Sequence, residues 1–411
     1  MEILGYMASI VVGIFILVVL ITIHELGHGI VARRNGVVVE EFGIGFPPRA
    51  RGKKIKKSIL GRNVLYSLNW LPIGGFVKLQ GEYDAADQKG DYGAATFWQK
   101  SRILLAGVGM NWLVAAVLFT VLALVGMPKV ITNQFMIASD VVIDKAPVTI
   151  DGVTNGLPAE LGGIRAGDIL KKVVPVEDSA CQLQTVVVPQ CDALAADEID
   201  SIIALTKSRP GERLKLVYVR DKVEAVTTIK NRTAAETRDG KGYIGVKFSQ
   251  DRPTTYRSTW SAPIVGVGLT GQLSWETLKG VGGLFTKLGS GLVGLINSDS
   301  TTRAKAAQEL GDTGNSVAGP IGIVFNVLPN AVTAGLVPIV LLTAIISLTL
   351  AVMNVLPIPA LDGGRWYTMA LFRLFNKPLT NEIEEKINSA GMMIVLGLIV
   401  LVTIADVSKI F

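Results

Sequence analysis

Four long apolar stretches limit what this chain can fold into. They cover residues 3–23, 103–127, 336–356 and 390–405, and the last three contain no Lys, Arg, Asp or Glu. A helix needs about 20 apolar residues to cross the hydrocarbon core of a bilayer. Apolar residues make up 49% of the 411-residue chain and charged residues only 18%. The sequence therefore predicts a polytopic α-helical membrane protein with four transmembrane helices, embedded in a lipid bilayer.

The first apolar stretch leads directly into the sequence His-Glu-Leu-Gly-His at residues 24–28. A cleaved signal peptide is the alternative for this stretch. Its start, Met1-Glu2, has no basic residue, however, and no cleavage site is evident before the histidines. We therefore expect residues 1–32 to form the first membrane helix.

The distribution of charge predicts the orientation. Residues 33–102 carry 13 Lys and Arg against 6 Asp and Glu, whereas residues 128–333 carry 22 against 21. Short basic loops stay in the cytoplasm, and long translocated domains count little. We expect 33–102 to be cytoplasmic, with both termini and the long 128–333 region outside. The basic run at 49–57 lies between spans and lacks interleaved aromatic residues, so it does not indicate a nucleic-acid partner.

The only two histidines of the chain, His24 and His28, are four residues apart. On a helix this spacing puts both imidazoles on one face, one turn apart, where both can bind one Zn²⁺. Glu25 beside them can act as general base toward a water activated by the metal. The alternative is a pair of packing histidines. Ionisable groups within a membrane span cost about 3 kcal/mol or more, which favours the metal site.

A catalytic zinc needs three protein ligands and one open position. The chain has no third histidine and its two cysteines lie far outside the spans, so we expect a carboxylate. The best candidate is Asp362, which follows Pro357 and Pro359 at the end of the third span and precedes two glycines. An ordinary glycine-rich loop is the alternative. With the expected orientation, the first and third spans both end on the cytoplasmic side, so the two motifs can meet.

These motifs resemble the site-2 proteases, intramembrane zinc metalloproteases of the M50 type, and in particular the bacterial regulator of sigma-E branch. The resemblance covers nearly the whole chain. It rests on His-Glu-Leu-Gly-His, on Asn-Val-Leu-Pro-Ile-Pro-Ala-Leu-Asp-Gly-Gly at 354–364, and on Gly-Val-Gly-Met-Asn at 107–111. The resemblance implies zinc ligands at His24, His28 and Asp362, a catalytic Glu25, and a substrate-supporting Asn354.

The loop at 33–102 reads as two short strands, 64–70 and 72–79, around a turn. The resemblance implies a membrane-associated β-hairpin that pairs with an extended substrate segment through Gly74, Gly75, Phe76 and Val77. A substrate helix hides its backbone amides, so it must be unwound and held before it can be cut. The alternative is a simple surface hairpin.

The external region contains Leu-Pro-Ala-Glu-Leu-Gly-Gly-Ile-Arg-Ala-Gly-Asp at 157–168, which is similar to a PDZ pattern. We expect one inserted extracytoplasmic PDZ (α+β) domain at 138–250, with a later helix at 195–208. Cys181 and Cys191 lie in an insertion of this region, where a disulfide is permitted but cannot be deduced from spacing. Residues 260–333 are expected to form an amphipathic helix and a connector. The alternative is a linker packed on the PDZ region.

The predicted domain order continues with a second span at 103–127, a third with its motif at 334–364 and a fourth at 388–406. The resemblance implies a zinc endopeptidase of the bacterial inner membrane, with its active site toward the cytoplasm. Expected substrates are single-span membrane proteins, such as anti-sigma factors already trimmed by an upstream site-1 protease, or remnant signal peptides. One alternative is a PDZ-containing membrane adaptor with a non-catalytic metal site. Another is a membrane-anchored protease that acts on soluble or misfolded proteins.

Overall fold

The structure of this chain is a computed structural model. It describes residues 2–82, 86–131, 133–176, 194–195, 199–250, 254–295 and 327–408, with the single positions 299, 301, 303, 305 and 323. The described residues form two compact units. One contains the long helices and a β-hairpin, and the other is formed from the segments 126–132 and 141–257.

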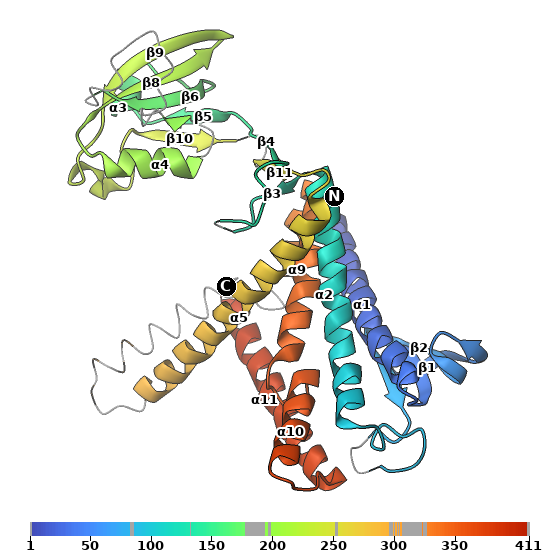
Figure 1. The fold of residues 1–411 in the computed structure, drawn as a ribbon. Helices are drawn as coiled ribbons and strands as arrows, with labels where there is room; N and C mark the ends of the chain where they lie inside the picture. Colours follow the sequence, from blue (N-terminus) through green and yellow to red (C-terminus); the bar gives the residue numbers. More distant parts are fainter. Residues whose placement is uncertain are drawn as a thin grey trace. The chain divides into compact units, whose positions relative to one another are not determined.

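Three long apolar helices form the frame of the first unit. They are α1 (Glu2–Arg34), α2 (Phe97–Val125) and α9 (Leu336–Val355), and α2 packs against both of the others (Figure 1). Each is long and apolar enough to cross a membrane, which confirms the prediction of a polytopic membrane protein. The fourth predicted span lies within α11 (Asn381–Ser408). That α11 also crosses the membrane stays a prediction.

Helix α2 begins six residues before the predicted span, at Phe97. The side chain of Gln99 accepts hydrogen bonds from the amide and the hydroxyl of Thr96, at 2.8 and 3.0 Å. The hydroxyl of Thr96 in turn accepts from the amide of Gln99. This reciprocal pair is a capping box, which satisfies free amides at a helix start. The helix therefore starts in the polar segment before the apolar run.

The predicted loop at 33–102 contains two long strands, β1 (Val39–Ser58) and β2 (Gly61–Leu79). Both extend to one side of α1 (Figure 1). Both strands bend, so β1 residues 39–46 lie between two parts of β2. Ile44, for example, pairs with Gly75 on one side and with Leu68 on the other. The prediction that 64–70 and 72–79 pair with each other around a turn is therefore wrong. Both are extended, but residues 39–46 insert between them.

Helix α5 (Ala262–Leu295) covers much of the predicted amphipathic segment, and it packs against α2. Its buried face carries Val265, Leu269 and Leu273. Gly266 faces α2, where an added Cβ would lie 2.7 Å from the carbonyl oxygen of Ala116. The helices approach closely because residue 266 has no side chain. The alternative of a linker packed on the PDZ region does not fit this helix-to-helix packing.

The second unit is an α+β domain with its own apolar core. Five strands run in the order β10-β5-β6-β8-β9, and short β7 (Leu194–Ala195) pairs with β6. Their bounds are Val246–Ser249, Val148–Val153, Ile169–Pro175, Arg213–Arg220 and Val223–Lys230. The predicted later helix is α4 (Ile199–Ser208), and Ala195 belongs to β7 instead. Short α3 (Pro158–Leu161) and the 3-10 turn Glu236–Asp239 complete it.

A small three-stranded sheet, β3-β11-β4, also belongs to the second unit. Its strands are Met127–Pro128, Thr255–Arg257 and Val142–Asp144. Among its described residues, the first unit also contains the helices α8 (Leu328–Ala334) and α10 (Asp362–Leu374). Cys181 and Cys191 lie outside the described residues, as does the connector around Gly319.

Candidate metal centre

Helix α1 brings His24 and His28 together as their spacing predicts. Their Nε2 atoms lie 3.1 Å apart, and their rings meet edge to face with centroids at 4.7 Å. Each residue is only 7% exposed. Two imidazole nitrogens that point at each other in a buried site need a proton or a cation between them, because two lone pairs repel.

Asp362 joins the two histidines from the other end of the chain. Its Oδ2 lies 3.0 Å from Nε2 of His24 and 3.2 Å from Nε2 of His28. Helix α9 ends at Val355, and α10 begins at Asp362 itself. Added Cβ atoms on Gly363 and Gly364 would lie 2.1–2.5 Å from carbonyl oxygens at the end of α9 and in the segment that follows it. The glycine pair thus lets α10 fold tightly back and place Asp362 beside α1.

The spacing of the three atoms fits a tetrahedral zinc. Ligands held at about 2.0–2.1 Å from Zn²⁺ are separated by about 3.3 Å in a tetrahedron. The three separations in this site are 3.0, 3.1 and 3.2 Å. Two nitrogens and one carboxylate oxygen are a known ligand set of catalytic zinc, which keeps its fourth position open.

The outer nitrogens of both imidazoles have partners that suit metal binding. Nδ1 of His28 lies 2.7 Å from the carbonyl oxygen of Ile103, so it donates its proton there and leaves Nε2 free to bind metal. Nδ1 of His24 lies 3.4 Å from the side-chain nitrogen Nδ2 of Asn111. The side-chain oxygen Oδ1 of Asn111 is buried without a hydrogen-bond partner. Exchanging the two amide atoms lets Oδ1 accept the proton of His24 Nδ1, which satisfies both groups. The donor set therefore fits a zinc ion.

Gly107 keeps α2 close to the histidines. An added Cβ there would lie 2.4 Å from Nε2 of His28 and 2.6 Å from Nε2 of His24. Only a residue without a side chain leaves room at this point. Gly107 and Asn111 are the two ends of the Gly-x-x-x-Asn motif, one helical turn apart.

Glu25 lies next to the ligand atoms and contacts the hairpin. Its carboxylate lies within 4.8 Å of the nitrogens of His24 and His28. Its Oε2 accepts a hydrogen bond of 3.1 Å from the backbone amide of Val77 in β2. The predicted general base thus lies between the metal ligands and the strand predicted to hold substrate.

The predicted substrate-binding residues fall into two groups. Gly75 and Val77 lie at the site, since a Cβ on Gly75 would be 3.9 Å from Cγ of Glu25. Phe76 packs over Gly43 of β1, and Gly74 adopts a positive φ of 88° where β2 bends. Asn354 bonds within its own helix, with Nδ2 donating to the carbonyl oxygen of Leu350 at 3.0 Å. Of these residues, we find only Gly75 and Val77 beside Glu25.

Sequence reasoning gave no role to the residues that support α10. Arg365, one turn after Asp362, donates to the carboxylate of Glu384 in α11 at 3.1 Å and to the carbonyl oxygen of Glu82 at 3.0 Å. It also lies over the ring of Tyr92, 5.5 Å from its centroid. These contacts join three separate segments. A basic residue three positions from a predicted ligand was the only available signal.

A histidine pair and an adjacent glutamate on an apolar helix, joined by a carboxylate from the start of α10, make up a site of the metallopeptidase class. Comparison with known proteins gives the family. Residues 12–398 match the model of peptidase family M50, so the chain belongs to this family. It is therefore a membrane metalloendopeptidase, and its cofactor is Zn²⁺.

Several named relatives match over almost their whole length. A putative zinc metalloprotease of Clostridium acetobutylicum is 30% identical over 97% of this chain and 97% of its own. One of Clostridium perfringens is 29% identical over 94% of this chain and 95% of its own. Zinc metalloprotease RasP of Bacillus licheniformis is 23% identical over 98% of this chain and 100% of its own. The predicted enzyme class is confirmed.

Proposed function

We propose that this protein is a zinc-dependent intramembrane endopeptidase that cleaves single-span membrane proteins. The observation that carries the proposal is the position of Glu25. It lies beside the ligand triangle of His24, His28 and Asp362 and bonds to the amide of Val77 in a neighbouring strand. The same few residues thus bring together a metal site, a base and a strand that can hold a peptide.

Glu25 performs the proton transfers in the proposed reaction. It takes a proton from the attacking water and returns it to the nitrogen of the leaving amine. Zinc, when bound to His24, His28 and Asp362, supplies the positive charge that activates the water and polarises the scissile carbonyl. The bond from Val77 orients the carboxylate of Glu25 before substrate arrives.

Strand addition to β2 explains how a helical substrate becomes cleavable. A membrane helix has all its backbone amides in internal hydrogen bonds, so it must unwind locally before attack. The Gly74–Val77 segment of β2 offers backbone groups for pairing with the unwound part. Gly75 leaves space beside Glu25 for the substrate backbone. We assign Asn354 a supporting role that requires it to turn away from Leu350.

The proposed substrates are single-span proteins whose outer part has been removed by a first protease, such as anti-sigma factors, or remnant signal peptides. In this proposal the chain resides in a bacterial inner membrane and crosses it four times. Both termini and the second unit lie outside, and the metal site lies toward the cytoplasm. The basic loop at 33–102 supports this orientation.

The second unit acts in this proposal as a PDZ domain that excludes substrates with a large outer part. Strand β10 supports this role, because it ends the sheet order and, among the described strands, has β5 as its one neighbour. An edge strand of this kind accepts a further strand from a peptide. The similarity of 157–168 to a PDZ pattern points the same way.

The variant Glu25→Gln tests the proposal in membranes that contain a candidate single-span substrate. We expect cleavage to be lost while zinc remains bound, because the ligands are unchanged. Glu40→Gln is the matched control, since Glu40 pairs with Lys78 at 2.9 Å on the exposed side of the loop. Retained turnover in Glu25→Gln would overturn the role of Glu25. A wild-type protein that is inactive and binds no zinc would favour the alternative of a PDZ-containing membrane adaptor.

A further inference from the structure

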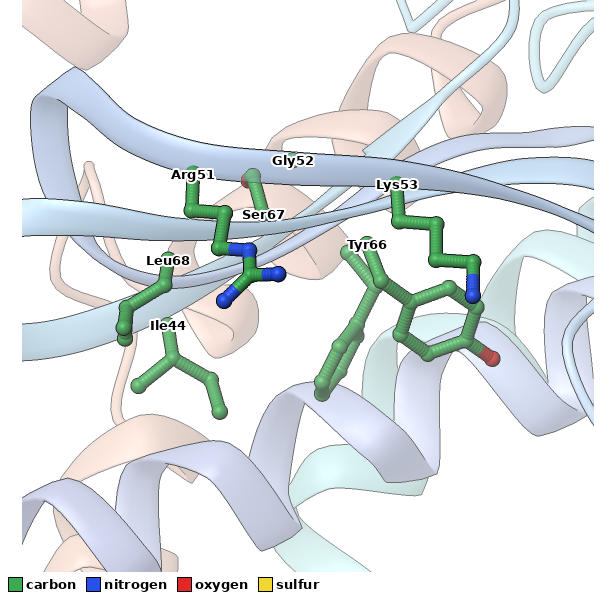
Figure 2. Close-up of a pocket in the computed structure, with 8 residues that line it drawn as sticks. Ile44, Arg51, Gly52, Lys53, Tyr66, Ser67 and Leu68 are labelled. Carbon is green, nitrogen blue, oxygen red and sulfur yellow. The ribbon is translucent and has the colours of Figure 1, made fainter.

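A pocket of ≈ 280 Å³ lies on one face of the β1–β2 sheet and takes no part in the proposed reaction. Its lining combines apolar side chains with two cationic ones (Figure 2). The residues are Phe42, Ile44, Arg51, Gly52, Lys53, Tyr66, Ser67 and Leu68.

The strand register explains this combination. Leu68 pairs with Ile44 on one side and with Arg51 on the other. One step along the same face, Tyr66 pairs with Phe42 and with Lys53. Side chains two residues apart on a strand share a face. Figure 2 shows Arg51 and Lys53 on the same side of the sheet as Ile44, Tyr66 and Leu68.

The two cations of the pocket are exposed and have no acidic partner among the residues that the structure describes. Two other cations of the same hairpin do have one. Arg49 pairs with Glu41 at 2.9 Å, and Lys78 pairs with Glu40 at 2.9 Å. The pocket therefore presents two uncompensated positive charges beside an apolar surface.

Large apolar side chains of the hairpin, around the pairing of Phe46 with Leu71, are also exposed. Phe46 is 46% exposed, Trp70 is 71% exposed and Leu71 is 52% exposed. By strand alternation Trp70 extends the row of Tyr66 and Leu68. Phe46 follows a register irregularity after Ile44 and pairs with Leu71. Exposed aromatic residues next to basic ones are typical of a surface in the interfacial layer of a membrane.

We propose that this pocket binds one anionic phospholipid of the surrounding bilayer. The guanidinium of Arg51 and the ammonium of Lys53 donate to the phosphate oxygens. The acyl chain lies along Ile44 and Leu68, toward Trp70. A lipid is favoured over an acidic peptide because the chain is embedded in a membrane and the apolar part of the pocket continues into exposed apolar side chains. The bound lipid anchors the outer part of the sheet whose other part contacts Glu25.

The test uses the full chain in a neutral detergent and native mass spectrometry. The protein is titrated with phosphatidylglycerol or with phosphatidylcholine of the same acyl chains. The variant pair Arg51→Gln with Lys53→Gln removes the charges of the pocket. The matched control is Lys54→Gln with Lys56→Gln, which removes the same charge from exposed positions on the opposite face of the strand. Thermal stability and zinc content show whether each variant is folded.

The wild-type protein is expected to bind phosphatidylglycerol with higher affinity than phosphatidylcholine. Each basic residue near an anionic headgroup is worth about a fivefold change in affinity, so the pocket pair should lower it about 25-fold. The control pair should change it by less than about threefold, because its charges lie on the other face. Equal losses in both pairs would mean a diffuse attraction and overturn the proposal. So would unchanged affinity in the pocket pair, or pocket-dependent binding of an acidic apolar peptide without phosphatidylglycerol binding.

Discussion

Substitution of Gly107 by alanine should abolish zinc binding without changing any ligand. The added methyl carbon would lie 2.4 Å from Nε2 of His28 and 2.6 Å from Nε2 of His24. Ordinary contact distances between such atoms begin at about 3.5 Å. The methyl group would therefore force a displacement of about 1 Å between α2 and each imidazole.

A displacement of this size exceeds what the metal site tolerates. Zinc–ligand distances in working sites stay within about 0.2 Å of their standard values. Loss of a residue that merely orients a ligand already lowers metal affinity about 10- to 100-fold. Because Gly107→Ala moves two ligands directly, we expect zinc affinity to fall by at least about 100-fold.

The assay is zinc content by inductively coupled plasma mass spectrometry, after equilibration against zinc buffered by a chelator. Gly109→Ala is the matched control, since it lies two residues away on the same helix and its Cβ would have nothing within 4 Å. Equal melting temperatures in excess chelator would show that both variants fold. One zinc per chain in Gly107→Ala, with affinity within about threefold of Gly109→Ala, would refute the reasoning.

Three further predictions concern the metal and the second unit. Asn111→Leu should lower zinc affinity about 10- to 100-fold, because His24 Nδ1 loses its partner; unchanged affinity in the same zinc titration would contradict this. Chelation should lower the melting temperature of wild type and of Glu25→Gln but not of His24→Ala, since zinc at 100 times its Kd stabilises the fold by about 2.7 kcal/mol. Burial alone raises the pKa of Asp168, but hydrogen bonds from Arg220 and an amide outweigh it and lower the pKa. Asp168 therefore stabilises the unit fully at pH values above its unfolded pKa of about 3.9. This stabilisation is lost as the pH falls through the lower pKa of the folded state. In the wild type, amide hydrogen exchange in β6 and β8 should accelerate as the pH falls through this range. In Asp168→Asn the exchange should depend less on pH.

The two histidines could be assigned from the sequence because their pairing is local. A spacing of four residues on any helix puts side chains on one face. Asp362 is 338 positions from His24, and its position rested on an exclusion of other ligands and on the direction of two spans. The structure brings the three together, but the exclusion worked only because the chain has so few histidines and cysteines.

The supporting residues could not be predicted, because their roles depend on how helices approach one another. The motif at 107–111 marks Gly107, but the sequence does not show why a glycine is required there until α2 is placed against the histidines. The same is true of Gly266, which faces α2 from α5. Strand pairing in the hairpin failed for a related reason. A local pattern indicates extended structure, but the insertion of 39–46 between two parts of β2 involves pairs far apart in sequence.

The packing of α2 also limits how a substrate can reach the metal. Gly107 brings the α2 backbone against the nitrogens of His24 and His28, so no peptide can approach them from that side. Asp362 has the most exposed side chain of the three predicted ligands, at 19% against 9% and 8% for the histidines. A catalytic zinc needs one open position. That position must therefore lie away from α2, where the carboxylate side of the site retains access and where Glu25 connects it to β2. A peptide that pairs with β2 therefore approaches the three ligands from the side that α2 does not cover.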